Sequence, residues 1–261
     1  MNDSSPFVLE ARDARGVVTL TLNRPGAFNA LSEGMLGALE DAIAGIAADD
    51  TVRAVVIAGA GKAFCAGHDL KEMRAAPALD YYQRLFARCG EMMLSLQRLP
   101  VPVIARVHGI ATAAGCQLVA VCDLAVASGE ARFAVSGVNV GLFCATPSVT
   151  LSRNLGRKEA FEMLVTGEFI GAEEAREKGL VNRVAPPDQL DAALEALLAS
   201  IVAKPRTALA LGKALFYRQL ETGIAPALAD ASQTMACNMM DASALEGVQA
   251  FIEKRPPSWK A

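Results

Sequence analysis

Two short segments place small residues where the chain must turn after a strongly apolar run. The first is the Ala-Gly-His sequence of residues 66–68, which follows an apolar run at residues 54–58. The second is the Ala-Ala-Gly sequence of residues 113–115, which follows an apolar run at residues 101–107. Both lead into helix-like sequence, where free backbone N–H groups lie at the positive end of the helix dipole. Two such donors directed at one carbonyl oxygen form an oxyanion hole.

Taken singly, each segment is also typical of an ordinary strand-to-helix turn. Together with their neighbours, residues 64–70, 109–123 and 166–168 resemble the crotonase (enoyl-CoA hydratase/isomerase) superfamily, and the resemblance covers nearly the whole chain. It implies that the N–H groups of His68 and Ala114 are the oxyanion donors. It also implies a coenzyme A thioester as substrate and no permanently bound cofactor.

Within the superfamily, residues 133–146 and 213–217 look most like the enoyl-CoA hydratase domain-containing 3 group. One departure from the family lies at the second donor. Ala114 stands where the family usually has glycine, so a methyl group is expected beside the acyl chain.

A larger departure concerns the residues that add water. The two catalytic glutamates of the family's hydratases align with Gln117, three residues after Ala114 on the same helical face, and with Gly137. A neutral amide cannot accept a proton at physiological pH, and glycine has no side chain. Since each general acid or base contributes about a hundred- to ten-thousandfold, we expect hydration of a 2-enoyl-CoA to be very slow. The acid of the superfamily's isomerases aligns with Ala145.

Several other groups are candidates to replace the missing carboxylates. An imidazole titrates near neutrality, so the side chain of His68 is one of them. Asp69 is another, although its usual role in the family is to fix the loop. The remaining candidates have ordinary structural alternatives as part of a solvated first turn or of the core: Glu72, Ser136 and Cys144. A Ser-His-Asp hydrolase is disfavoured because no Gly-x-Ser-x-Gly sequence is present.

Residues 23–31 resemble the family's loop that receives the adenine and ribose of coenzyme A. Arg24 is a candidate for a phosphate contact, and an ordinary surface turn is the alternative. Lys213, with Tyr217 and Arg218, is a candidate to meet the same nucleotide from a neighbouring subunit. The full set of residues implied for the thioester is Arg24, Ala27, Ala66, His68, Leu70, Ile110 and Lys213.

Regular elements with short connections are predicted around these segments. Strands are predicted at residues 17–22, 52–58, 103–107, 123–127, 132–135 and 180–184. Helices are predicted from the N-cap Ser32 to about residue 47, and at residues 77–99, 115–121, 147–155, 157–166, 172–178, 187–203, 205–220 and 224–254. The repeated order argues for an α/β fold of stacked ββα turns with parallel strands.

The resemblance implies that these turns form a spiral with two roughly perpendicular sheets, followed by a C-terminal helical trimerisation segment. We predict a core at residues 1–199 that holds the acyl-CoA pocket, and an oligomerisation segment at residues 200–261. The late helices carry more apolar groups than a free surface helix tolerates, among them Met235, Met239 and Met240. The resemblance implies a homotrimer or a dimer of trimers, and these apolar residues agree with that expectation.

Composition excludes other classes of protein. The 261 residues carry a net charge of −3 and no long basic cluster, which argues against nucleic acid as a partner. The six cysteines form no Cys-x-x-Cys pair and only two histidines are present, so no metal site is expected. No apolar run has membrane-spanning length. The N-terminus lacks the pattern of a signal or transit peptide, which favours a cytoplasmic location.

Three functional hypotheses follow. The leading one is an acyl-CoA-binding protein, resembling enoyl-CoA hydratase/isomerase lyases, that has an oxyanion hole and lacks the two hydratase glutamates. The second is a different thioester-enolate reaction, such as isomerisation, decarboxylation or C–C cleavage. The third is a catalytically weak protein that binds coenzyme A thioesters. The sequence leaves open whether the chain is an enzyme.

Overall fold

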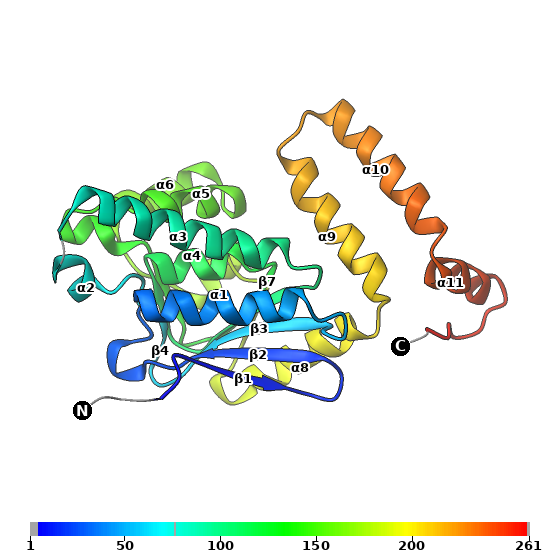
Figure 1. Cartoon of the computed structure of the whole chain (residues 1–261), viewed down its shortest axis with the longest axis horizontal. Coiled ribbons are helices and arrows are strands. Elements are labelled where there is room, and N and C mark those ends of the chain that lie inside the picture. Colours follow the sequence, from blue (N-terminus) through cyan, green and yellow to red (C-terminus); the bar gives the residue numbers. More distant parts are fainter. Residues whose placement is uncertain (1–4, 76, 260–261) are drawn as a thin grey trace.

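The computed structural model describes residues 5–75 and 77–259. Residues 1–4, part of the N-terminus from which a location was inferred, lie outside the described residues. The chain forms two β-sheets, helices that cover the larger sheet, and a C-terminal run of helices that projects away from the sheets (Figure 1).

The larger sheet has six strands in the order β1-β2-β3-β5-β7-β10. Their bounds are β1 Val8–Arg12, β2 Val17–Leu22, β3 Ala54–Gly59, β5 Val103–Val107, β7 Leu124–Ser128 and β10 Arg183–Ala185. Strand β1 is antiparallel to β2, and all other neighbours are parallel. The continuous apolar run of β3 is buried on both faces, as is usual in parallel sheets, and β5 is buried except at Arg106, which forms an ion pair with Asp191.

The smaller sheet has four short strands in the order β4-β6-β8-β9. Their bounds are β4 Ala63–Cys65, β6 Ile110–Thr112, β8 Arg132–Ala134 and β9 Ile170–Gly171. Each of β3, β5 and β7 in the larger sheet is followed by the next strand in the smaller sheet and then by helix. The predicted stack of ββα turns is therefore confirmed.

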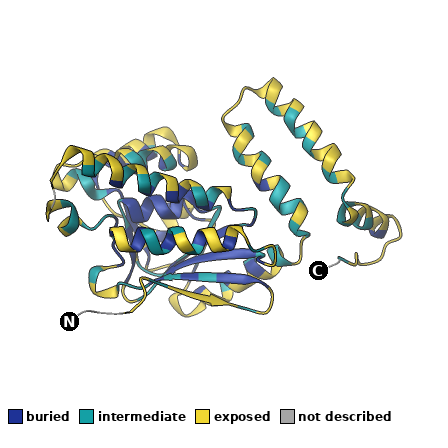
Figure 2. Ribbon diagram, viewed as in Figure 1, coloured by how far each residue is buried: buried dark blue, intermediate teal, exposed yellow. Residues whose placement is uncertain are grey.

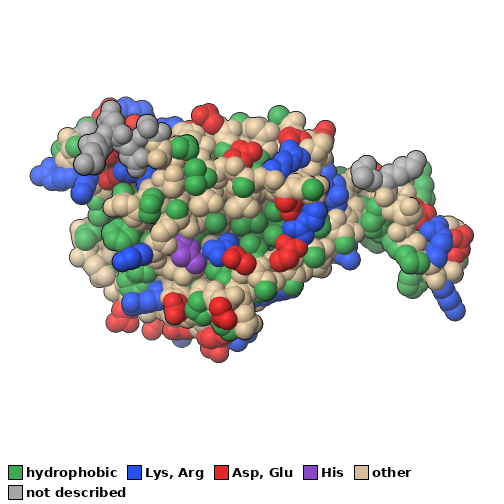
Figure 3. All heavy atoms as spheres, turned by 90° about the horizontal axis from the view of Figure 1, so that it is seen from below, with side chains coloured by type: hydrophobic (Ala, Val, Ile, Leu, Met, Phe, Trp, Pro, Cys, Tyr) green, Lys and Arg blue, Asp and Glu red, His purple; other side chains and the backbone are tan. Residues whose placement is uncertain are grey.

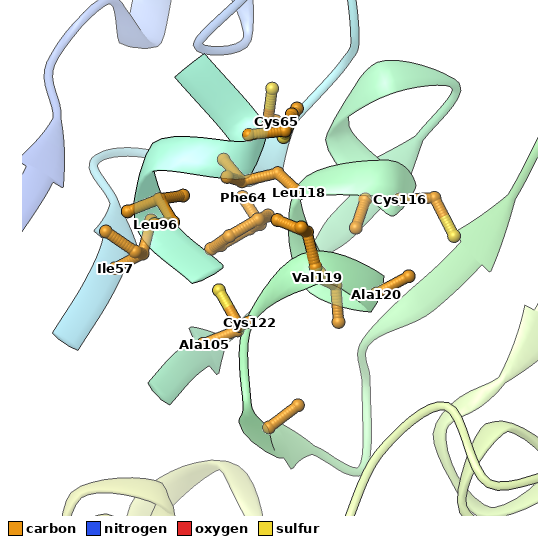
Figure 4. Packing of buried hydrophobic residues seen from close by; sticks show 14 of the residues in the cluster. Ile57, Phe64, Cys65, Leu96, Ala105, Cys116, Leu118, Val119, Ala120 and Cys122 are labelled. Atoms are coloured by element: carbon orange, nitrogen blue, oxygen red, sulfur yellow. The ribbon is translucent and has the colours of Figure 1, made fainter. Parts of the chain in front are cut away.

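Helices cover both faces of the larger sheet. On one face lie α1 (Glu33–Ala47), α3 (Leu79–Arg98) and α4 (Ala114–Val121), which share one apolar core with the sheet. Helix α8 (Leu190–Val202) packs on the opposite face through Leu190, Leu194 and Leu198. All residues of α4 are buried, so this helix lies at the centre of the molecule (Figure 2). Figure 4 shows Leu118 of α4 beside Phe64 of β4.

Short helices connect these layers. Their bounds are η1 Pro25–Ala27, α2 Leu70–Ala75, η2 Ser136–Val140, α5 Ala145–Asn154, α6 Arg157–Thr166, α7 Ala172–Glu177 and η3 Pro187–Gln189. The predicted cap of α1 is present, since the Ser32 side chain accepts a hydrogen bond from the backbone N–H of Met35.

The C-terminal arm consists of α9 (Arg206–Leu220), α10 (Ile224–Met239) and α11 (Ala242–Ile252). The single helix predicted at residues 224–254 is wrong, because Asp241 interrupts it and caps α11 by accepting from the Ser243 N–H. Helix α8 continues to Val202 on the sheet, so the change from packed helix to projecting helix comes at residues 203–205.

A buried polar cluster joins α9 to the core. The ammonium of Lys213 donates to the carbonyls of Leu96 (3.1 Å) and Val101 (2.9 Å) and to the carboxylate of Asp123 (2.7 Å). The hydroxyl of Tyr217 donates to the other oxygen of Asp123 at 2.7 Å. Burial lowers the pKa of Lys213, and the Asp123 carboxylate opposes that change. Because Asp123 directly follows the C-cap of α4, the cluster connects the arm to the central helix.

Candidate active site

The turn after β4 lies directly against the start of α4. Gly67 has φ +89°, and a Cβ atom there would stand 3.1 Å from the backbone nitrogen of Ala114 and 2.9 Å from the Cβ of Ala113. The turn is also tied to the loop before α1, since Leu31 N–H donates to the Gly67 carbonyl at 2.8 Å. Glycine at 67 therefore allows two segments that are far apart in the sequence to come into contact.

The start of α4 is equally close to β4. A Cβ atom on Gly115 would lie only 2.1 Å from the carbonyl oxygen of Cys65. The residue before the helix, Ala113, has φ 50° and ψ −122°, a conformation that alanine rarely adopts. Its N–H donates to the Ala134 carbonyl at 3.0 Å, which holds the strained turn in place. Strain of this kind is concentrated at functional sites.

Two backbone amides in these adjoining turns have no acceptor. In the part of the chain that the structure describes, no hydrogen bond is found for the N–H of His68 or for the N–H of Ala114. Ala66 donates to Phe28, Asp69 donates to Leu31 and Gln117 donates to Ala113, whereas the N–H groups of Gly115 and Cys116 in the first turn of α4 also have no acceptor among the described residues. The two amides expected from the sequence to be oxyanion donors are thus free of backbone partners.

Gln117 lies one turn into α4 and is only 4% exposed. Its side-chain oxygen is buried and finds no donor among the described residues. Helical side chains tilt toward the N-terminus of their helix, so this carboxamide extends toward the end of α4 that carries the Ala114 N–H. A buried polar atom without a partner is unfavourable by about 1–3 kcal/mol, which marks this position as one that a ligand or water can satisfy.

The imidazole of His68 is in a similar position. Both ring nitrogens are buried and neither forms a hydrogen bond of normal geometry with any described group. The ring packs edge-on against Phe86 of α3, with the ring centres 5.3 Å apart. Burial lowers the pKa of His68, and the nearby Leu31 backbone only partly opposes this shift. The side chain is therefore neutral at physiological pH.

Gly137 lies in η2 and has no room for a side chain. A Cβ atom there would meet the Leu142 carbonyl oxygen at 2.4 Å and the Cys144 sulfur at 2.8 Å. The Gly137 N–H donates to that sulfur at 3.3 Å. Burial raises the pKa of Cys144 above its usual range despite this hydrogen bond. The first residue of α5, Ala145, is exposed.

Asp69 accepts the hydrogen bonds that fix its loop. One carboxylate oxygen accepts from the N–H groups of Lys71 (3.1 Å) and Glu72 (3.4 Å) at the start of α2. The other accepts from Arg24 at 3.1 Å. Burial alone would raise the pKa of Asp69, but these donors outweigh it and hold the pKa below its usual range. The Arg24 guanidinium also lies over the ring of Phe7.

Most of the other residues implied for the thioester lie on adjoining segments, because the Ala66 N–H donates to the Phe28 carbonyl at 3.0 Å and Ile110 pairs with Ala63 of β4. Ala27 ends η1, and Leu70 and Ile110 are exposed at the starts of α2 and β6. Lys213 is not available to a ligand. Its ammonium already has three acceptors beneath α9 and retains no hydrogen for a nucleotide phosphate. Arg218, named with it, forms an ion pair with Asp230.

A cavity of about 970 Å³ lies elsewhere, between the β1–β2 turn, the start of α9 and α11. Asp241 and Ser243 line this cavity, and none of the predicted site residues does. The candidate site is recognised from unpaired polar atoms among the described residues. Figure 3 shows basic side chains next to acidic ones over the face viewed from below.

Sequence reasoning missed two features of this region. One is the strained conformation of Ala113, whose φ is 50°. An alanine in a sequence gives no indication of a positive φ. The other is a 2.8 Å hydrogen bond between the hydroxyls of Thr112 and Ser136, which joins the two neighbouring strand ends and occupies Ser136. Hydroxyl residues are too common for either one to have predicted this pairing.

In residues 5–75 and 77–259, no three His, Cys, Asp or Glu side chains come together as a metal site. None of the helices within those ranges combines the length and apolar character that crossing a bilayer requires.

The repeated ββα turns, the two sheets and the C-terminal helices define an α/β protein of the crotonase fold class. A sequence profile for enoyl-CoA hydratase/isomerase matches residues 12–261. The chain belongs to this family, as the sequence resemblance predicted.

Individual relatives agree with this assignment. The mitochondrial enoyl-CoA hydratase domain-containing protein 3 of Rattus norvegicus is 44% identical over 98% of this chain and 86% of its own. The crystal structure of the human protein of that name is 42% identical, with a TM-score of 0.93, and covers 98% of this chain and all of its own (100%). The structure of an enoyl-CoA hydratase of Mycobacterium smegmatis is 70% identical, with a TM-score of 0.97, and covers 98% and 99% of the two chains.

One expectation is contradicted by these relatives. The proteins named enoyl-CoA hydratase domain-containing protein 3 in rat, mouse, frog and human are mitochondrial. This conflicts with the cytoplasmic location inferred from the N-terminus, and that inference is wrong. Lack of a recognisable targeting pattern in one sequence is weak ground for a location.

Proposed function

We propose that this protein binds acyl-CoA thioesters and polarises the thioester carbonyl between the N–H groups of His68 and Ala114. The observation that carries the proposal is that both amides lack acceptors among the described residues while Gly67 brings their turns into contact. A carbonyl oxygen that accepts from both donors would be stabilised as it gains negative charge. Each donor of this kind is worth roughly 3 kcal/mol in a transition state.

Membership of the enoyl-CoA hydratase/isomerase family supports a coenzyme A thioester as the ligand. Arg24 is our candidate for a phosphate contact, since Phe7 and Asp69 hold its guanidinium at the turn before η1. Ala27, Ala66, Leu70 and Ile110 remain candidates for the rest of the coenzyme. Lys213 is not included, because its hydrogen-bonding capacity is used inside the protein.

We further propose that ordinary hydration is not the activity of this chain. Gln117 cannot transfer a proton, and the packing around Gly137 leaves no space for a second carboxylate. The chemistry that two amide donors support without these carboxylates is formation of a thioester enolate. A protein with no catalysis that only binds thioesters is the simpler alternative.

Calorimetric titration with butyryl-CoA and octanoyl-CoA tests the proposal. Ala114→Pro removes the second donor at the first residue of α4; because Gly67 lies against this nitrogen and Ala113 has φ 50°, thermal unfolding must show that the variant is folded before its binding is compared. Arg157→Pro makes the same change at the exposed first residue of α6 and is the matched control. We expect binding by the wild type and the control, and binding at least about fivefold weaker in Ala114→Pro.

Two results would contradict this assignment. If neither thioester binds, the site is not a thioester site. If crotonyl-CoA is hydrated at the rate of an ordinary enzyme, about ten turnovers per second or more, then the absence of carboxylates at residues 117 and 137 does not limit hydration.

A further inference from the structure

The candidate site contains donors for a developing oxyanion. Formation of an enolate also needs a group that accepts the proton lost by the substrate. An enolate forms only when a base removes a hydrogen from the carbon next to the thioester carbonyl. Several titratable and nucleophilic side chains lie in the segments around the two free amides. A base must have an acceptor atom that no other group occupies.

Most of these side chains are already occupied. Both oxygens of Asp69 accept hydrogen bonds, from the start of α2 and from Arg24, which weakens this carboxylate as a base. One oxygen of the Glu72 carboxylate accepts from the Glu33 N–H at 3.0 Å at the start of α1, and no hydrogen bond to its other oxygen is found among the described residues. The Ser136 hydroxyl is paired with Thr112. Burial keeps the Cys144 thiol protonated.

His68 differs from all of these. Neither of its ring nitrogens forms a hydrogen bond of normal geometry with a described group, although the Leu31 backbone lies near the ring. Burial keeps the ring neutral, and a neutral imidazole has one nitrogen with a free lone pair. Contact with Phe86 fixes the ring edge-on, so the side chain does not depend on a hydrogen bond for its orientation.

The backbone of the same residue supplies the position. The N–H of His68 is the proposed first oxyanion donor, so a carbonyl bound there lies within one side-chain length of the imidazole. Resting on the proposed function, we infer that the His68 imidazole is the catalytic base that removes the α-proton of the bound acyl thioester.

The step balances without a further reactant. The α C–H bond breaks, its proton forms an N–H bond on the free ring nitrogen, and the electron pair becomes the enolate of the thioester. The negative oxygen accepts from the N–H groups of His68 and Ala114. Return of the proton from the imidazolium to the same carbon regenerates the starting thioester. In heavy water the returned hydrogen is deuterium once the imidazolium exchanges with solvent.

The experiment is deuterium incorporation at C2 of butyryl-CoA and octanoyl-CoA in heavy water, followed by proton NMR, beside calorimetric binding of the same thioesters. We expect the wild type to exchange the C2 protons faster than buffer does. His68→Gln keeps the backbone donor and a polar side chain but cannot take up the proton. It should lower the exchange rate at least about a hundredfold and leave binding within a few-fold of the wild type.

A matched control distinguishes this role from a structural one. His108 bonds to the Gly61 carbonyl at 2.9 Å through its ring, and His108→Gln should leave C2 exchange unchanged. Thermal unfolding shows whether His68→Gln is folded, and His68→Phe, which keeps the ring contact with Phe86, serves as a second variant. Retained C2 exchange in both folded His68 variants would overturn the inference. Loss of C2 exchange in Asp69→Asn, with exchange retained in the His68 variants, would also overturn it.

The inference and the proposed function fail differently. Binding of both thioesters by the wild type without C2 exchange overturns the role of His68 and leaves the thioester site standing. Failure of both thioesters to bind overturns both. Exchange that survives in Ala114→Pro but not in His68→Gln supports the base and contradicts the two-donor oxyanion hole.

Discussion

At the scale of single residues, the candidate site depends on what glycine and amide side chains permit. Gln117, which the sequence predicts to align with one family glutamate, has a buried oxygen without a partner among the described residues, and Gly137, predicted to align with the other, has no space around it. The two losses therefore differ in kind. A carboxylate could replace Gln117 with little change in volume, whereas residue 137 is closed by the Leu142 carbonyl and the Cys144 sulfur.

This closure predicts that Gly137→Ala lowers the free energy of unfolding by about 1–3 kcal/mol, because the new methyl group overlaps a backbone oxygen. Chemical denaturation measures the change. Gly45→Ala is the control, since a Cβ atom there meets nothing within 4 Å and alanine favours the interior of α1. Equal effects of the two substitutions would show that residue 137 is not enclosed as described.

His68 predicts a pH dependence of stability. Its pKa is lowered in the folded protein, so below the unfolded value of about 6.5 the unfolded chain takes up a proton that the folded chain refuses. Stability is therefore lost as the pH falls from 6.5 toward the folded pKa. His68→Phe removes this contribution and should show a smaller loss between about pH 7.5 and 5.5 in urea denaturation. If the pH dependence of stability in His68→Phe equals that of the wild type, the pKa of His68 is not lowered by folding.

At the scale of elements, the long apolar and amphipathic segments could be predicted from sequence. Strand β2 and helix α6 have the predicted bounds, and α1 begins after the predicted Ser32 cap. The short strands β4 and β6 were not predicted, because three residues show no periodicity. The donor turns were found nonetheless, since small residues after apolar runs signal close backbone approach. Contact between the two turns could come only from the fold.

The break between α10 and α11 illustrates another limit. An apolar pattern continues across residues 239–242, and only the capping geometry of Asp241 separates the helices. Lys213 was assigned to a ligand for a similar reason, because a charged residue in a helical pattern resembles a surface residue. Its burial depends on Asp123, which is 90 residues away in the sequence.

The cluster of Lys213, Asp123 and Tyr217 predicts how the arm is held. Lys213→Met leaves the Asp123 carboxylate without its cation and should cost roughly 3–5 kcal/mol, as is typical when one partner of a buried pair is removed. Hydrogen exchange should increase most in α9. The exposed Lys158→Met in α6 is the control. Unchanged protection of α9 would show that the cluster does not anchor the arm.

At the scale of the whole molecule, the arm has too much apolar surface for a solvated segment. Ile224 is 81% exposed and Phe251 is 85% exposed, and Met235 and Met240 are also largely exposed. Figure 2 shows that the arm is mostly exposed or intermediate where the sheets are buried. Exposed apolar areas of this kind mark contacts with other chains, which agrees with the predicted trimer or dimer of trimers.

Sedimentation velocity tests this prediction. We expect the wild type to sediment as a trimer or hexamer, and the double variant Met240→Asp with Phe251→Asp to dissociate, because charges would replace buried apolar contacts. Leu79→Asp, an equally exposed apolar residue at the start of α3, is the control outside the arm. If the wild type sediments as a monomer, the apolar residues of the arm do not mediate contacts between copies of this chain.

The central claim is that two backbone amides from separate turns meet one thioester oxygen. Difference infrared spectroscopy of butyryl-CoA labelled with ¹³C at the carbonyl reads this contact directly, since each donor lowers the carbonyl stretching frequency. We predict a bound band clearly below that of the free thioester in water, and a smaller displacement in Ala114→Pro. A bound band at the frequency of free thioester, or one unchanged in Ala114→Pro, would contradict the account.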